Sequence, residues 1–280
     1  MRLRGGRFAG VGAALAGGIA IFAAALALAL AGTLFMVDPN AQDLGTTFAA
    51  PLTEGHLLGT DSLGRDVLSW IAHSVTTSLK IGLAIVALSA LLGIVVGVIS
   101  AYIGGALDTL LMRMVDLQLA IPPLLLFIAA AAVVGTSQTT LILLVSVISW
   151  VTYARLVRTQ ILVEKQRASI AAARLAGIGH VRIVMRHLLP SIGSVVLVVA
   201  SLQLGFVLLW EASLAFVNLG VQPPDTSLGF LIAQGRSTLA QAWWVVVFPG
   251  VMLALLLLAA NLVGDGLRDY FGVEAEVIDR

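Results

Sequence analysis

The sequence contains no cysteine and few charged residues. Asp, Glu, Lys and Arg together make up 11% of its 280 residues, whereas soluble domains have about 25%. Without cysteine the chain can form neither disulfides nor thiolate metal sites. Its four histidines lack metal-ligand spacing, and a net charge of +1 does not indicate binding to nucleic acid. With 59% hydrophobic residues and a mean hydropathy of +1.03, the chain is predicted to lie mainly in lipid.

Motifs for catalysis are also missing. A P-loop requires the pattern GxxxxGK[ST], but the only lysines, Lys80 and Lys165, follow Leu79 and Glu164. No GxSxG motif or dinucleotide-binding fingerprint occurs. We therefore predict that this chain has no catalytic residue and no metal site, and binds no cofactor.

Six apolar stretches are long enough to cross a bilayer, whose core of ~30 Å requires roughly 20 helical residues. Each must be helical, because lipid offers no partner for exposed backbone groups. The first is about twice as long as the apolar part of a signal peptide and is read as a retained span. The prediction is an all-α polytopic membrane protein with six transmembrane helices, at about Phe8–Val37, Ser78–Tyr102, Leu117–Val134, Thr139–Leu156, Ser191–Val217 and Ala242–Val263.

Lys and Arg are distributed unevenly between the two sides of these spans. The segments on the side of the N-terminus hold 13 of the 16, and cytoplasmic segments carry an excess of positive charge. Both termini are therefore predicted to be cytoplasmic. The outer residues are Arg65, Lys80 and Arg236, and the cytoplasmic ones are Arg2, Arg4, Arg7, Arg113, Arg155, Arg158, Lys165, Arg167, Arg174, Arg182, Arg186, Arg268 and Arg280.

The spans divide the chain into three parts. Residues 1–77 hold the first span and a long extracytoplasmic loop, residues 78–270 form the membrane core, and residues 271–280 are a cytoplasmic tail. A second outer loop, about 218–241, contains Pro223-Pro224 and Gly229, which indicate an ordered turn. The only long cytoplasmic loop, about 157–190, lies between spans four and five.

The cytoplasmic loop has a regular pattern. Residues 164–176 are rich in Ala, Arg and Gln, which favour a helix, and Gly177 can close that helix in the left-handed conformation. A second short helix is predicted over residues 180–189, ending at Pro190. Val181, Val184, Met185 and Leu188 would form its apolar face, with Arg182 and Arg186 opposite. This pattern suits either a helix lying on anionic lipid or a docking element for a cytoplasmic partner.

The segment "IAAARLAGIGHVRIVMRHLLPS" resembles the EAA loop of permease subunits of bacterial ATP-binding-cassette importers. That loop reads EAA, three residues, Gly, and later His-x-x-Pro. In this family it is the coupling helix that sits in a groove of the ATPase subunit. Ala171 stands where the family usually has glutamate, which puts any salt bridge of that glutamate in doubt. The coupling residues implied by the resemblance are Ala171, Ala172, Ala173, Arg174, Gly177, Arg182, His187 and Pro190.

Further segments extend the resemblance to nearly the whole chain. "DPNAQDL", "HLLGTDSLGRDVLSW", "LGVQPPDTSLGF", "AWWVVVFPG" and "NLVGDGLRD" are similar to the C-type permeases of the dipeptide, oligopeptide and nickel importers. The resemblance implies the type I importer permease fold in the bacterial inner membrane. It also implies a homologous B-type permease partner, two cytoplasmic ATPase subunits that hold ATP and Mg²⁺, and an extracytoplasmic substrate-binding protein.

The resemblance leaves the substrate open, because peptide and nickel permeases share these motifs. Peptides are the first choice and nickel or another small solute is the alternative. A channel or secondary transporter would work without an ATPase, and inverted repeats and several intramembrane charges would favour it. A membrane scaffold that positions other proteins is a further alternative.

Glu211 is the one acidic residue well inside an apolar stretch, where a charge is costly and normally faces a cavity or a partner. It could line the translocation path and meet a peptide ammonium group. It could equally lie near the outer interface, solvated or paired with Arg236. The sequence leaves both interpretations open.

Other residues are predicted to have structural roles. Gly93 and Gly97 are spaced to let two helices approach closely. Asp61 and Arg65 are expected to form an ion pair that orders the first outer loop. Two further structural expectations are a kink or helix start at Pro122-Pro123 and pairing of Arg113 with Asp116.

Overall fold

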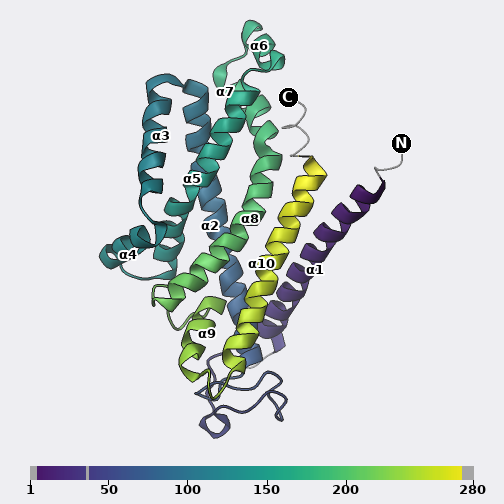
Figure 1. Cartoon of the computed structure of the whole chain (residues 1–280), viewed down its shortest axis with the longest axis vertical. Coiled ribbons are helices and arrows are strands. Elements are labelled where there is room, and N and C mark those ends of the chain that lie inside the picture. The colour runs from purple at the N-terminus through teal and green to yellow at the C-terminus, as the bar shows by residue number, and fades with distance from the viewer. Residues whose placement is uncertain (1–4, 36–37, 273–280) are drawn as a thin grey trace.

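The computed structural model describes residues 5–35 and 38–272, and within these residues every regular element is a helix. The long helices run along one axis (Figure 1). They are α1 (Gly5–Phe35), α2 (Val67–Ile103), α5 (Gln138–Glu164), α8 (Leu189–Phe216) and α10 (Trp244–Phe271). The shorter ones are α3 (Gly105–Ala120), α4 (Pro123–Val134), α6 (Ala168–Leu175), α7 (His180–Ile183) and α9 (Leu228–Gly235), with a π-helical turn at Val184–Leu188 and 3-10 turns at Leu44–Thr46 and Arg236–Thr238.

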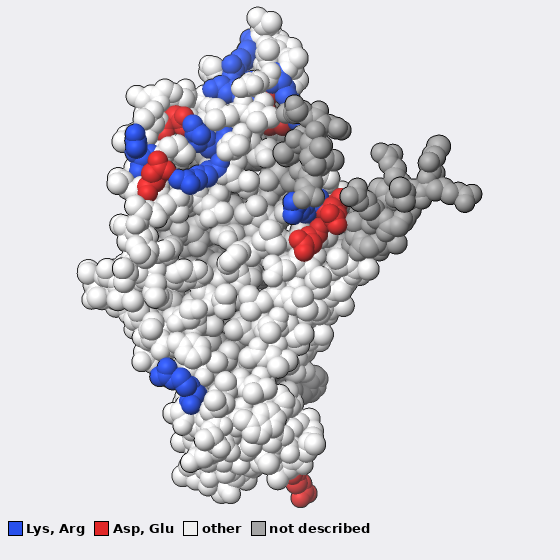
Figure 2. Space-filling model, viewed as in Figure 1, with Lys and Arg blue, Asp and Glu red and all other residues white. Residues whose placement is uncertain are grey.

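The two ends of this bundle differ. Helices α6 and α7 lie at one end, here called the α6 end, and α9 lies with the loop 38–66 at the opposite end, the α9 end (Figure 1). Lys and Arg gather mainly at the α6 end, and a broad uncharged band separates the two ends (Figure 2). The predictions for Arg2, Arg4, Arg280, Val37 and the tail from residue 273 onward concern positions outside the described residues.

Five helices in the described part of the chain are long and apolar enough to span a membrane, or six if a bent pair counts as one span. The bent pair is α3 and α4, whose axes differ by 92°. The predicted span Leu117–Val134 is therefore not one straight helix, and the predicted kink or helix start at Pro122-Pro123 is confirmed, since α4 begins at Pro123. Ile121 and Pro122 have extended backbones with ψ of 127° and 126°, because a residue before proline is driven out of the helical region.

Most predicted spans are too short at one or both ends. Helix α2 begins at Val67 rather than Ser78 because Asp66 caps it, accepting a hydrogen bond of 2.8 Å from the Ser69 amide. Residue 77, the boundary proposed between the first two parts of the chain, therefore lies inside a continuous helix. Helix α5 continues eight residues beyond Leu156, to Glu164, so the coupling loop begins there.

Helices α2 and α5 pack closely at two glycines. A Cβ atom on Gly93 would lie 2.4 Å from the Tyr153 Cβ, and one on Gly97 would lie 2.7 Å from the Ala154 carbonyl oxygen. Real Cβ atoms do not approach so closely, so the backbones of these helices can touch only where α2 has no side chain. The two glycines with helical spacing, Gly93 and Gly97, thus lie where α2 contacts α5.

Helix α3 is joined to α5 by two ion pairs. Arg158 donates to both Asp108 oxygens over 2.6 and 2.7 Å, and Arg155 donates to Asp116 over 2.5 Å. The predicted pairing of Asp116 with Arg113 on its own helix is wrong. Both carboxylates instead face arginines of the neighbouring helix.

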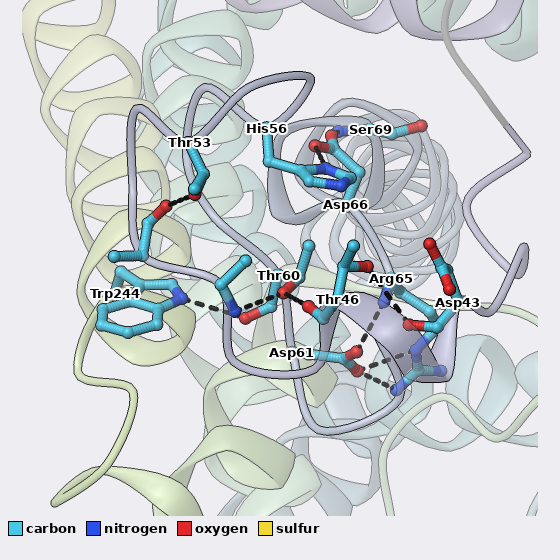
Figure 3. Close-up of polar contacts among 12 residues, drawn as sticks. Asp43, Thr46, Thr53, His56, Thr60, Asp61, Arg65, Asp66, Ser69 and Trp244 are labelled. Carbon is cyan, nitrogen blue, oxygen red and sulfur yellow. Dashed lines mark hydrogen bonds and ion pairs between the residues drawn. The ribbon is translucent and has the colours of Figure 1, made fainter.

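The loop 38–66 is ordered by side chains pointing into it (Figure 3). Arg65 donates two hydrogen bonds, of 2.8 and 2.6 Å, to the Asp61 carboxylate, and both residues are buried. The predicted ion pair is confirmed. The Arg65 guanidinium also lies 3.7 Å from the centre of the Trp70 ring, and Trp244 donates to the Thr60 carbonyl over 3.0 Å. These contacts fasten the loop to α2 and α10.

Candidate functional site

The loop between α5 and α8, here called the coupling loop, turns at Gly177. This residue has a φ of +73°, in the left-handed region where glycine is favoured. The Ile178 amide donates to the Ala173 carbonyl over 3.1 Å and the Gly177 amide to Arg174 over 3.0 Å. This pair of bonds is a Schellman motif, which satisfies the last carbonyls of a helix. Gly177 therefore ends α6 and reverses the chain.

The second helix of the loop does not end at Pro190 as predicted. Helix α7, the π-helical turn Val184–Leu188 and α8 form one apolar stretch from His180 to Phe216. Proline cannot donate to the carbonyl four residues earlier and clashes with it. In the turn just before Pro190, the Leu189 amide instead donates to the Val184 carbonyl, five residues back. The wider turn lets the helix continue.

This wider turn changes which side chains are buried, so the predicted apolar face is only partly right: Val184 and Leu188 pack in the core, but Val181 and Met185 do not. Ile183 and Leu188 are fully buried, whereas Val181 is 77% and Met185 59% exposed. The prediction assumed a spacing of three and four residues, and the π-helical turn places residues five apart on one side. Val181 and Met185 are left as apolar side chains on the outside of the loop.

A small apolar core holds the coupling loop to the long helices. Ile170 and Ala173 of α6 pack in one cluster with Val98 and Ala101 of α2. Further buried members come from α5, α7, the π-helical turn and α8: Val157, Ile161, Ile183, Leu188 and Ile192. Interiors packed in this way transmit displacement because they compress little. A force on the loop therefore reaches the ends of three long helices.

The outer surface of the loop carries the residues named from the sequence. Of these, Ala173 is buried in the core just described. The others are exposed: Ala171, Ala172, Arg174, Gly177, Arg182, His187 and Pro190. Leu175 lies among them with 91% of its surface exposed. Apolar side chains interspersed with arginines form a surface that can bind a protein groove of matching shape with acidic groups at its edge.

Glu211 lies inside the chain, near the α9 end. It is 1% exposed, and its Oε1 accepts a hydrogen bond of 2.5 Å from Ser227 Oγ. The interpretation of Glu211 as solvated or paired with Arg236 is wrong, because Arg236 is exposed and Glu211 bonds the residue that precedes α9. In this conformation Glu211 also faces no open surface along which a substrate could pass.

Two contacts that the sequence did not suggest lie beneath the coupling loop. Tyr102, near the end of α2, hydrogen-bonds His180 with 2.7 Å between its oxygen and Nδ1. Lys165 donates to the carbonyls of Ala101 and Tyr102. These partners are 63 to 78 residues apart in the chain, so no local pattern could have identified them.

The described residues offer a small pocket but no cluster of metal-ligating side chains. No group of three or more His, Asp or Glu side chains among them could hold a metal ion. A pocket beside α9 has a volume of about 160 Å³ and is lined by residues such as Asn218, Gln222, Phe230 and Gln234. Ligand sites usually measure about 300–1,000 Å³, so this pocket is too small for a peptide.

The fold and the coupling loop together define a helical protein of the membrane with a structured, basic loop at one end. The chain belongs to the family described as binding-protein-dependent transport system inner membrane component, which it matches over residues 93–273. That region contains the whole coupling loop and Glu211. The family resemblance inferred from the sequence is confirmed.

Individual relatives cover most of the chain. It is 40% identical to the di/tripeptide transport system permease protein DppC of Pseudomonas aeruginosa, over 76% of this chain and 70% of the relative. It is 36% identical to the dipeptide transport system permease protein DppC of Haemophilus influenzae, over 91% of this chain and 88% of the relative.

Proposed function

We propose that this chain is a permease subunit of an ATP-driven importer and forms half of a translocation pathway for di- or oligopeptides. The observation that carries the proposal is the similarity to dipeptide permeases over as much as 91% of the chain. The exposed coupling loop supports the ATP-driven class, because a surface of this kind is where a separate motor can act. The substrate class rests on the relatives' names.

The proposed orientation places the α6 end in the cytoplasm of a bacterial cell and the α9 end outside the inner membrane. The gathering of Lys and Arg at the α6 end (Figure 2) supports it, because cytoplasmic segments are enriched in these residues. The uncharged band between the ends matches the region that lipid would cover.

Four partner subunits complete the proposed machine. A homologous B-type permease supplies the other half of the pathway, and two cytoplasmic ATPase subunits bind ATP and Mg²⁺ and dock on the coupling loops. A substrate-binding protein delivers its cargo at the α9 end. Because Ala171 carries no charge, docking here depends on the apolar side chains Leu175, Val181 and Met185 and on the arginines of the loop.

The mechanism follows from how the loop is held. ATP binding closes the ATPase dimer and draws the two coupling loops together. The core shared by α2, α5, α6 and α8 carries that movement into the membrane. The pathway then opens outward to accept substrate and returns after hydrolysis. Such a two-state change requires the ATP-bound motor to bind one state more tightly than the other.

Reconstitution tests the proposal. The four-subunit complex of this chain, the B-type permease and two ATPase subunits, placed in proteoliposomes with the binding protein, ATP and a radiolabelled dipeptide, is expected to accumulate the peptide. Vesicles with the same complex and no ATP are the control. Accumulation of nickel in place of peptide would support the alternative cargo. Peptide flux through this chain alone would indicate a channel, and uptake by a complex lacking this chain would indicate a scaffold.

A further inference from the structure

Tyr102 is the point at which α2 meets the coupling loop. Its hydroxyl oxygen lies 2.7 Å from His180 Nδ1, and the two rings pack edge to face with centres 5.7 Å apart. His180 is the first residue of α7. The phenol thus joins the last turn of α2 to the start of the helix that continues into α8.

A second residue holds the same turn from the other end of the loop. Lys165, the residue that caps α5, donates to the Ala101 carbonyl over 3.1 Å and to the Tyr102 carbonyl over 2.9 Å. Carbonyls at a helix C-terminus lack helical donors and carry partial negative charge, so an ammonium group binds well there. The Lys165 ammonium and the Arg174 guanidinium also lie 5.7 and 5.9 Å from the Tyr102 ring.

Tyr102 therefore contacts the loop before, within and after α6. The start of α7 has few other anchors, since His180, Val181 and Arg182 are exposed and Ile183 is the buried residue of this helix. The segment that follows is the π-helical turn, a wider and less regular form of helix. Without the phenol, α7 could shift relative to α2 while α6 stayed in place.

Helix α2 leads from this contact to the opposite end of the molecule. Its 37 residues correspond to about 55 Å of helix. Near its other end, Ser78 Oγ accepts a hydrogen bond of 3.1 Å from the Leu228 amide of α9, and Ser74 donates to Thr226 over 3.1 Å. A displacement of α2 at the α6 end would thus reach α9 directly.

We infer that Tyr102 is a positioning residue that carries movement of the coupling loop into α2 through its hydrogen bond to His180. The inference rests on the proposed function and adds the route by which the motor acts. In this role Tyr102 acts through the coupling loop and not on ATP or substrate. Its removal should therefore separate ATP hydrolysis from transport without abolishing either subunit assembly or the hydrolytic step.

The test compares Tyr102→Phe with the unmodified chain in the reconstituted complex. Phenylalanine keeps the ring and loses only the hydroxyl, so the apolar contacts remain. The measured quantity is the number of ATP molecules hydrolysed per peptide accumulated. A hydrogen bond worth about 1 kcal/mol corresponds to a change of roughly fivefold in this ratio. Tyr270→Phe is the matched control, because Tyr270 is an exposed tyrosine near the end of α10.

A double-mutant cycle separates the hydrogen bond from a general structural role. The double variant should raise the ratio no further than His180→Ala alone, because without His180 the Tyr102 hydroxyl has no hydrogen bond left to lose. An unchanged ratio in Tyr102→Phe, or effects that add in the double variant, would overturn this inference alone. Absence of ATP-driven uptake by the unmodified complex would overturn the proposed function and this inference with it.

Discussion

Ser227 Oγ donates a hydrogen bond to Glu211 Oε1, and both residues are buried. The same hydroxyl oxygen accepts a bond of 3.1 Å from the Phe230 amide, so Ser227 is also the N-cap of α9. Glu211 of α8 is therefore joined through Ser227 to the start of α9, which gives the buried carboxylate a structural partner.

The first prediction concerns the stability provided by this contact. Glu211→Ala leaves the buried Ser227 hydroxyl without its acceptor and is expected to lower the free energy of unfolding by about 1–3 kcal/mol. Glu211→Gln keeps an oxygen that can accept the bond and should lose less. Thermal unfolding of the purified complex in detergent measures both.

Uptake by Glu211→Gln then separates two roles. Normal peptide uptake by this variant would show that anchoring α9 is the function of the side chain. Reduced uptake with unchanged thermal stability would contradict a purely structural role and return Glu211 to the translocation pathway.

Some of the structure follows directly from local sequence. Long apolar runs predicted the membrane helices, since no other element satisfies its own backbone in lipid. Asp61 and Arg65 are four residues apart, so their ion pair could be predicted from local sequence alone. Gly93 and Gly97 predicted a close helix contact from their spacing, although the partner helix, α5, could not be named.

Other features depend on contacts between distant segments. The bend between α3 and α4 arises from Pro122 and Pro123, but its angle of 92° is set by what surrounds it. The π-helical turn before Pro190 changed the buried face of α7 because the helix continued through a residue that normally ends one. The role of Glu211 required knowing that Ser227 folds back onto α8.

The second prediction concerns the α2–α5 contact. An alanine at Gly93 would place its Cβ 2.4 Å from the Tyr153 Cβ and 2.6 Å from the Trp150 carbonyl oxygen, so the two helices must separate. Overpacking of this kind costs about 1–3 kcal/mol. The midpoint of thermal unfolding should fall accordingly.

Gly193→Ala is the matched control for Gly93→Ala. Gly193 lies in α8, and no heavy atom lies within 4 Å of the position its Cβ would occupy. The same substitution there should be neutral or stabilise the helix by about 0.5–1 kcal/mol. Equal effects at both glycines would contradict the close contact between α2 and α5.

The third prediction concerns the buried ion pair of the loop 38–66. Arg65→Ala leaves the Asp61 carboxylate buried without its charged partner, which costs about 3–5 kcal/mol. Arg65→Lys should lie between this variant and the unmodified chain, because an ammonium group lacks the fork and the flat face that stacks on Trp70. Limited proteolysis of the loop reports the loss of order.

Arg236→Ala serves as the control for Arg65. Arg236 is an exposed arginine at the same end of the molecule, and exposed substitutions usually change stability by less than about 0.5 kcal/mol. Cleavage of the loop at the same rate in Arg65→Ala and Arg236→Ala would rule out an ordering role for the ion pair.

The last prediction concerns the turn of the coupling loop. Gly177→Val forces a β-branched residue to a φ of +73°, which costs about 1–3 kcal/mol of backbone strain. Helix α6 is held at this turn by two Schellman hydrogen bonds and can relieve the strain by changing its orientation. Membrane insertion and assembly should be unchanged, while peptide uptake per ATP hydrolysed falls roughly tenfold for each 1.4 kcal/mol of lost coupling. Gly177→Asn should retain most uptake, because asparagine tolerates the left-handed conformation.

Gly179→Ser is the control, since Gly179 has a φ of −62° and open space around it, and serine is a favoured N-cap residue. If Gly177→Val transports peptide as efficiently as Gly179→Ser, the shape of this turn does not transmit force from the ATPase.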